Sequence, residues 1–358
     1  MSILEISPRI KPGQNKQTKE NYMPDKQVIA KADSKSIVVG IDIDKLVKKA
    51  QESYAKKDQG LAKKLSTGRT IIRPNEDKDY VVWTKGDHWK SLTNLKGLPF
   101  GRIVQISGKP DSGKSTHAMA FMKFAQDQGV LVLLWDAERK FSAKRFDEKM
   151  GGHSDNLLVV DTNKIIDGAK AIAQFVHAAK EMNPDIKILI VWDSVGASLN
   201  STEDKDDGTE DFSQQPGVSA KENSYAIKKF NKLANNYINA ETGEATIATL
   251  IINQTYSSIG MGAPSQIEKG GQEIYYLSSI IIQLSRKKDL IRIKNGDKYK
   301  YGIVSRAKVK KNHLFEGDEC ISELDLVISA DGVHLAKDVK AFDDIKGWED
   351  EEDGGDDE

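Results

Sequence analysis

The stretch Gly108-Lys-Pro-Asp-Ser-Gly113-Lys114-Ser115 decides the fold class, because it fits the pattern G-x-x-x-x-G-K-[ST] in full. Gly108 and Gly113 allow backbone conformations in which successive N–H groups point at a phosphate. Lys114 supplies a point charge for the β- and γ-phosphates, and the Ser115 hydroxyl suits a Mg²⁺ shell. An apolar run enters this loop and a helical pattern leaves it, which argues against a chance Gly-Lys turn.

The loop therefore predicts a site for a nucleoside triphosphate, with the N-terminus of the next helix adding partial positive charge. The remaining residues expected to line it are Lys109, Pro110, Asp111, Ser112 and Thr116.

Two acidic strand ends accompany the loop. Ile188-Leu-Ile-Val-Trp-Asp193 is apolar on both faces and ends in a carboxylate, where a Mg²⁺ partner is needed. Leu133-Leu-Trp-Asp136-Ala-Glu138 ends in two carboxylates. Glu138 is the candidate that orients or deprotonates the attacking water, and a solvated loop acid is the alternative.

The pattern from about Gly97 alternates strand-like with helix-like runs, which predicts an α/β fold with a mostly parallel sheet flanked by helices. Two polar, basic strands are expected to follow the sheet at about 289–295 and 300–311. The expected strands are 102–107, 130–135, 157–160, 188–193, 246–253 and 280–285. The expected helices are 115–128, 142–150, 165–182, 219–239 and 271–278.

Composition points to a protein of the reducing cytoplasm that handles nucleic acid. The 358 residues are 38% hydrophobic and 30% charged, with a net charge of −1. Lys and Arg gather in 284–313 and acids in the last dozen residues, an asymmetry typical of nucleic-acid partners. Cys320 is the one cysteine, which excludes an intramolecular disulfide. Neither a membrane span nor a signal-peptide core is expected.

The chain is expected to have four parts. Residues 1–35 are polar and aperiodic and are predicted to be a disordered arm. Residues 36–68 hold a short strand and a helix, about 44–65, whose apolar stripe must dock on something. Residues 69–335 form the core, and 336–358 form a disordered acidic tail. The tail is expected to compete with DNA for basic surface, with solubility as the alternative role, and the two are compatible.

These motifs, in this order, resemble the RecA family of DNA strand-exchange recombinases, including phage members. The resemblance covers roughly residues 60–335. It implies a RecA-like P-loop NTPase core that binds ATP and Mg²⁺, with catalytic roles for Glu138 and Lys114. Phe146 resembles an aromatic residue that stacks on adenine, although Phe146 and Met150 share a helical face and core packing is the alternative.

The resemblance also implies two DNA-contacting loops. Asn253-Gln254 resembles the strand end at which the family's Gln senses the γ-phosphate and passes that state to a loop, here 255–269. Ile259 matches an apolar wedge between base steps, and Gly270 and Gly271 open a helix whose N–H groups suit a phosphate. An active-site lid is the alternative for this loop. The second loop, about 200–217, is longer and more acidic than the family pattern.

Several basic residues match the family's DNA-contacting positions, and a solvated face is the alternative for each of them. Arg306 and Lys308 alternate on one strand, which puts them on the same face of the sheet. Lys311-Asn-His313 resembles a segment that reaches the neighbouring subunit's γ-phosphate, although the family usually has Lys in place of His313. The other matching positions are Lys221, Lys228, Arg286 and Lys287.

Taken together, the sequence predicts an ATP-dependent DNA recombinase with DNA-stimulated ATP hydrolysis. It would act as a homo-oligomeric helical filament on single-stranded DNA, pair it with double-stranded DNA, and work with single-strand-binding and loader proteins. It would be cytoplasmic, either nucleoid-associated or in the host of a phage. The alternatives are a RecA-fold hexameric helicase, a regulatory ATPase, or a non-catalytic DNA-binding mediator in which Glu138 is incidental.

Overall fold

The computed structural model describes residues 80–201, 217–239, 242–258, 265–314 and 320–335, together with 45, 48–50 and 52. The chain divides into two units, Met1–Ile71 and Ile72–Glu358. The described residues of the first unit are helical. The expected arm, the tail, most of the 36–68 segment and most of the acidic loop lie outside the described residues.

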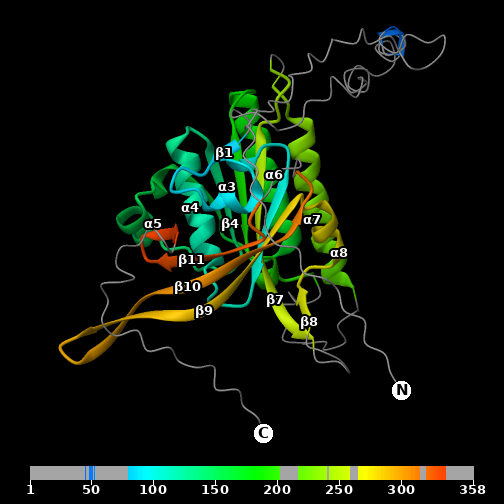
Figure 1. Ribbon diagram of the computed structural model, residues 1–358. Helices are drawn as coiled ribbons and strands as arrows, with labels where there is room; N and C mark the ends of the chain where they lie inside the picture. The colour runs from blue at the N-terminus through cyan, green and yellow to red at the C-terminus, as the bar shows by residue number, and fades with distance from the viewer. Residues whose placement is uncertain are drawn as a thin grey trace, which may run out of the picture. The chain divides into compact units, whose positions relative to one another are not determined.

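The second unit is built on a ten-stranded sheet with the order β12-β11-β10-β9-β3-β7-β6-β4-β5, and β8 pairs with β7 off this path (Figure 1). Neighbours from β9 to β5 are parallel, and those from β9 to β12 are antiparallel. This confirms the expected α/β fold with its mostly parallel sheet. The parallel strands are β3 (Ile103–Gly108), β4 (Leu131–Asp136), β5 (Leu157–Val160), β6 (Ile188–Asp193) and β7 (Ile247–Ser258). Strand β9 (Ile280–Lys294) pairs parallel with β3 and antiparallel with β10. The remaining strands are β8 (Ser265–Glu268), β10 (Asp297–Asn312), β11 (Glu323–Ser329) and β12 (Gly332–Leu335).

Helices cover both faces of this sheet, as continuous apolar strands require. The helices are α4 (Lys114–Asp127), α5 (Ala143–Met150), α6 (Ile165–Met182), α7 (Val218–Asn236) and α8 (Gln272–Leu277), with short 3₁₀ turns at η1 (Ser154–Asn156) and η2 (Val195–Ala197). One buried cluster joins α4 and α5 to one face of the sheet. A second joins α6, α7 and α8 to the other.

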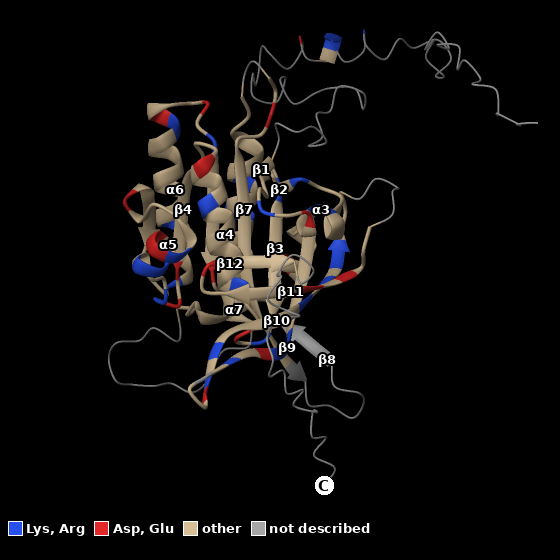
Figure 2. Cartoon of the chain, turned by 60° about the vertical axis from the view of Figure 1, so that its left-hand side comes forward, with Lys and Arg blue, Asp and Glu red and all other residues tan. Residues whose placement is uncertain are grey.

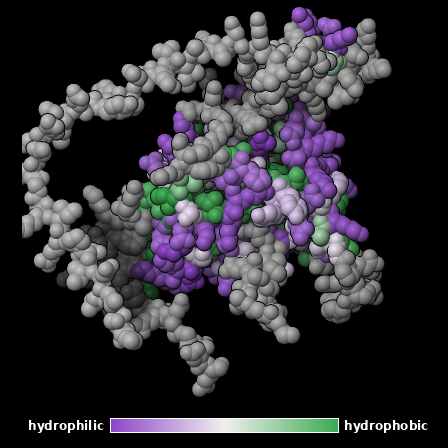
Figure 3. Space-filling view, turned by 45° about the vertical axis from the view of Figure 1, so that its right-hand side comes forward, coloured by the Kyte–Doolittle hydropathy of each residue, from purple (hydrophilic) through white to green (hydrophobic). Residues whose placement is uncertain are grey.

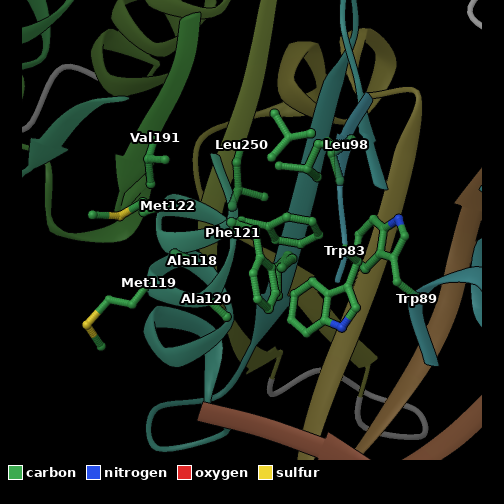
Figure 4. Close-up of a cluster of buried hydrophobic side chains, with 14 of the residues drawn as sticks. Trp83, Trp89, Leu98, Ala118, Met119, Ala120, Phe121, Met122, Val191 and Leu250 are labelled. Atoms are coloured by element: carbon green, nitrogen blue, oxygen red, sulfur yellow. The ribbon is translucent and has the colours of Figure 1, made fainter. Parts of the chain in front are cut away.

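A small aromatic unit precedes the sheet and was not predicted from the sequence. It consists of β1 (Tyr80–Val82), α3 (His88–Thr93) and β2 (Gly97–Pro99), with β1 and β2 antiparallel. Trp83 packs edge-on against Phe121 of α4, with ring centroids 4.6 Å apart, and Trp89 does so at 4.8 Å (Figure 4). The unit is therefore part of the core, because its aromatic side chains complete the outer side of α4.

Two strand expectations need correction. The segments expected at 280–285 and 289–295 are one continuous strand, β9 (Ile280–Lys294), which pairs with β10 along most of its length. Beyond the pairing of β10 with β11 these strands form a two-stranded hairpin that projects from the sheet (Figure 1). Strand β7 also runs past Asn253 to Ser258 and pairs with β8, so the two sides of the expected 255–269 loop form a β-hairpin.

Charged residues follow this layering. In Figure 2 the central strands are tan over most of their length, whereas charged residues lie along the helices and along the β9–β10 hairpin. The described surface seen in Figure 3 is largely hydrophilic, with smaller hydrophobic patches. Within the described ranges, no helix combines the length and the apolar character needed to cross a membrane.

We expect acid to destabilise this fold through His88. Burial lowers the pKa of His88 to about 3, and the charges of His117 and His334 act in the same direction. The unfolded chain, with a His pKa near 6.5, therefore binds the extra proton first. The stability that depends on neutral His88 is therefore fully present above about pH 6.5. As the pH falls from there towards 3, the free energy of unfolding decreases by about 1.4 kcal/mol per pH unit.

Chemical unfolding as a function of pH checks this expectation. Between about pH 6.5 and pH 4.5, the free energy of unfolding should fall by about 2–3 kcal/mol less in His88→Phe than in the wild type. The same change at exposed His153 is the control. A His88→Phe profile parallel to that of the wild type would contradict the assignment.

Candidate active site

The phosphate loop connects β3 to α4, and two of its own side chains donate hydrogen bonds to its backbone. The Lys114 ammonium donates to the Lys109 carbonyl oxygen at 2.6 Å. The Ser112 hydroxyl donates to the same oxygen at 2.9 Å. Burial lowers the pKa of Lys114, while nearby Asp193 and Glu138 act against this shift. The lysine is therefore a buried cation held by a neutral acceptor, so an anionic phosphate would be a stronger partner.

The antiparallel strands support the loop from behind. Gly113 has φ +93°, and a Cβ there would lie 2.1 Å from Ile328 Cδ1 of β11. The buried Ser305 hydroxyl of β10 donates to the Ser112 carbonyl oxygen at 2.9 Å. A larger residue at Gly113 would thus require both an unfavourable backbone conformation and displacement of the Ile328 side chain.

Asp193 and Ser115 fit a Mg²⁺ ion. Asp193 ends β6 and accepts a hydrogen bond from the Ser115 hydroxyl, but its buried Oδ1 has no hydrogen-bond partner in the described part of the chain. Burial raises the pKa of Asp193 to about 6, and the charges of Glu138 and Asp136 add to the rise. A buried carboxylate oxygen without a donor is costly unless a cation compensates it, and oxygen donors are those that Mg²⁺ prefers.

Glu138 receives three side-chain donors at the same edge of the sheet. Its Oε1 accepts from the Ser194 hydroxyl at 2.5 Å and from the Gln254 amide at 2.6 Å. Its Oε2 accepts from the Lys140 ammonium at 3.0 Å. Burial alone would raise the pKa of Glu138, but the hydrogen bonds from Ser194, Lys140 and Gln254 outweigh it and lower the pKa. Glu138 is thus an ionised acceptor beside Lys114 and Asp193.

Backbone hydrogen bonds fix the turn that carries Glu138. The N–H groups of Ala137 and Glu138 both donate to the Asp193 carbonyl oxygen, at 2.8 and 3.3 Å. The side chain of Asp136 accepts from the Lys140 and Phe141 N–H groups, at 3.2 and 2.9 Å. The first carboxylate of the expected pair therefore organises the turn, and the second faces the site.

Gln254 connects this site to the β7–β8 hairpin. Its carbonyl oxygen accepts from the Lys269 N–H at 3.1 Å. The Asn253 amide donates to the Lys269 carbonyl oxygen at 2.8 Å. The residue that follows β8 is therefore hydrogen-bonded to Gln254, which reaches Glu138, and to its neighbour Asn253.

Thr116 and Phe146 have packing roles in this structure. The Thr116 hydroxyl accepts from the Arg145 guanidinium at 2.9 Å, and Arg145 also donates to the Ser329 carbonyl oxygen at 3.3 Å. Phe146 has 0% exposed surface and packs against Phe141, with ring centroids 5.6 Å apart. Of the two interpretations left open for Phe146, stacking on adenine or core packing, this burial matches the core.

The basic residues of β9 and β10 that were expected to contact DNA carry internal counter-charges. Arg306 pairs with Asp325 at 2.8 Å and with Glu323 at 3.0 Å, and Lys287 pairs with Asp325 at 3.0 Å. Lys308 lies 3.8 Å from Glu323, which confirms that Arg306 and Lys308 share a face. Arg286 likewise pairs with Asp289. A phosphate would therefore have to replace carboxylates at this surface.

The remaining expected DNA contacts that the structure describes lie on α7 and directly before α8. Lys221 and Lys228 are exposed on α7, and Lys228 pairs with Glu273 of α8 at 3.3 Å. Gly270 and Gly271 precede α8 with φ of +95° and +88°. A Cβ at Gly270 would also lie 2.5 Å from Val195 Cγ1, so close packing is a second reason for glycine there. Ile259 lies outside the described residues.

Lys311 does not face the nucleotide site of its own chain. Its ammonium donates to the carbonyl oxygens of Tyr275 and Tyr276 at 2.7 and 3.2 Å and lies 4.8 Å from the Tyr275 ring centroid. It therefore caps the end of α8, where carbonyl groups lack helical partners.

Sequence reasoning missed four residues of the site: Ser194, Lys140, Ser305 and Arg145. Ser194 and Lys140 each lie within two residues of an expected carboxylate, so proximity was an available signal. Ser305 and Arg145 act across 193 and 29 residues of sequence, and no local pattern marks them.

Comparison with known proteins identifies the family of this chain. A family model described as the RecA N-terminal domain matches residues 80–330. The chain belongs to the RecA family. It is 28% identical over 220 residues to Protein RecA of Rippkaea orientalis, which covers 61% of this chain and 57% of that protein. It is 30% identical over 222 residues to Protein RecA of Cytophaga hutchinsonii, covering 62% and 56%. The chain thus matches a little over half the length of these RecA proteins.

We expect Ser305 to stabilise the phosphate loop. Ser305→Ala should lower the unfolding free energy by about 1–2 kcal/mol, because the buried Ser112 carbonyl loses its donor. It should also weaken nucleotide binding, since the loop is held less firmly. Ser285→Ala, an exposed change on the paired strand, is the control. Denaturant titration and nucleotide binding measure both effects, and equal values for the two variants would refute the role.

Proposed function

We propose that this chain is an ATP-dependent DNA recombinase that forms filaments on single-stranded DNA and promotes homologous pairing and strand exchange. The observation that carries the proposal is the 2.6 Å hydrogen bond from Gln254 to Glu138. It joins the group best placed to activate water to the strand that continues into the β7–β8 hairpin. A change at the triphosphate can thereby alter the position of the hairpin. This is the coupling that is needed if the bound nucleotide is to control the affinity for DNA.

The proposed hydrolysis uses the groups at the sheet edge. Lys114 and the loop N–H groups bind the phosphates. Ser115 and Asp193 would hold Mg²⁺, which when bound neutralises charge on the β- and γ-phosphates. Glu138 accepts a proton from water as the water oxygen bonds to the γ-phosphorus. The bond from the γ-phosphorus to the bridging oxygen breaks, and ADP leaves with that electron pair.

DNA binding is proposed for two surfaces. The first is the 255–269 segment, with Ile259 as a wedge between base steps and phosphate contacts from four residues nearby. The second is the basic surface of β9 and β10, where phosphates would exchange with Asp289, Glu323 and Asp325 in a salt-dependent manner. The contacts of the first surface are Lys221, Lys228, Gly270 and Gly271. Those of the second are Arg286, Lys287, Arg306 and Lys308.

The helical filament is proposed to complete the site. In this arrangement residues 36–68 dock on a neighbouring copy, and Lys311 leaves the end of α8 to reach that neighbour's γ-phosphate. Single-strand-binding and loader proteins are proposed to assist assembly. Electron microscopy with single-stranded DNA and a non-hydrolysable ATP analogue should show regular helical filaments, whereas closed rings would favour a ring motor.

Glu138→Gln should abolish catalysis and spare binding. We expect DNA-dependent ATP hydrolysis to fall by at least about a hundredfold, because the amide cannot accept the proton of water. Nucleotide affinity should stay close to that of the wild type. Glu148→Gln, an exposed change on α5, is the control. Unchanged hydrolysis would favour a non-catalytic mediator, and directional unwinding without strand exchange by the wild type would favour a helicase.

Gln254→Ala should make the affinity for single-stranded DNA independent of the bound nucleotide. The wild type is expected to bind single-stranded DNA more tightly with a non-hydrolysable ATP analogue than without it. The variant should bind equally in both conditions, because its side chain no longer reaches Glu138. Gln174→Ala on the exposed face of α6 serves as the control. Fluorescence anisotropy of labelled DNA measures both, and full nucleotide dependence in Gln254→Ala would contradict this route.

A further inference from the structure

Lys140 is a cation beside the nucleotide site that the proposed mechanism does not use. Its side chain is 78% exposed, and its ammonium lies 3.0 Å from Glu138 Oε2. Its backbone N–H is held by Asp136 Oδ1 at 3.2 Å, and the next N–H, that of Phe141, by Asp136 Oδ2 at 2.9 Å. The backbone of this lysine is therefore fixed at the sheet edge, while its long side chain faces solvent.

The charges around Lys140 are those of the phosphate site. Besides Glu138, the carboxylates of Asp193 and Asp111 are close enough to raise the pKa of Lys140, and Lys140 in turn acts to lower the pKa of Lys114. Lys140 thus lies within electrostatic reach of Asp111 and Lys114 in the phosphate loop. A polyphosphate entering that loop would add several negative charges at short range from this ammonium.

The three donors on Glu138 differ in how easily they can leave. Ser194 is completely buried, and Gln254 is held in the middle of a sheet strand. Lys140 is the exposed donor, on a flexible four-carbon stem, and among the described residues it is the one that donates to Oε2. When Lys140 leaves, the carboxylate of Glu138 keeps the donors Ser194 and Gln254 on Oε1, so it is not left without hydrogen bonds.

We propose that Lys140 is a second triphosphate-binding cation, held on Glu138 without nucleotide and transferred to the γ-phosphate when ATP binds. This inference rests on the proposed ATPase function. The transfer leaves Glu138 Oε2 open to receive the proton of the attacking water. ADP has no γ-phosphate, so Lys140 remains on Glu138 in that state. The lysine thereby distinguishes ATP from ADP and frees the base only when substrate is present.

Equilibrium binding of a non-hydrolysable ATP analogue and of ADP, each with Mg²⁺, tests the proposal on the full chain. Lys140→Ala should bind the analogue about tenfold or more weakly, as expected for loss of one charge-assisted hydrogen bond, and ADP within about twofold of the wild type. Lys140→Arg should keep most of the discrimination, because a guanidinium also donates to phosphate oxygens. Lys144→Ala, an exposed change in the first turn of α5, is the matched control.

Each outcome decides between interpretations. An equal loss for the analogue and ADP would mean that Lys140 only shapes the turn, and it would overturn the inference. Unchanged binding of both ligands by Lys140→Ala would also overturn it, with the proposed function intact. If the wild-type chain did not bind one nucleotide per chain, whether ADP or the analogue, the proposed function would be overturned, and the inference with it.

Discussion

The carboxylate of Glu138 is the acceptor on which the active edge of the sheet depends. It follows β4, its partner Ser194 follows β6, and Gln254 lies in β7. Parallel strands end at the same edge, so short turns suffice to bring these side chains together. The bonds from Ser194 and Gln254 join three strands through one partly buried anion. Its displacement would therefore change contacts on β7 and in the hairpin beyond it.

Cations in this chain are held by internal acceptors at the positions proposed for phosphates. Lys114 is held by the Lys109 carbonyl oxygen, Lys140 by Glu138, and Arg306 by Asp325. When a polyanion binds at such a position, the cation exchanges one acceptor for another. The free energy gained is therefore smaller than for a cation without an acceptor in the protein. This makes binding sensitive to salt and to the charge of the ligand, which suits a protein that must both hold and release its substrates.

Local sequence determined the parallel half of the fold and the phosphate loop. The strand at 157–160 and the helix at 165–182 were predicted to the residue, because continuous apolar runs and helical periodicity are properties of neighbouring residues. The G-x-x-x-x-G-K-[ST] pattern fixed the loop for the same reason. The ends of apolar strands then located Asp193 and Glu138, since a parallel sheet has one carboxyl edge, whereas Gln254 was singled out by the resemblance to the RecA family.

Tertiary structure alone decided what depends on distant partners. The continuity of β9 and the β7–β8 hairpin come from cross-strand hydrogen bonds, which override a local preference for turns. The burial of Phe146 and the donor from Ser305 depend on elements that are close only after folding. The ion pairs of Arg306 likewise depend on β11 lying beside β10. Such contacts cannot be predicted from residue spacing, because the separation of two distant residues in the sequence does not determine the distance between them in the fold.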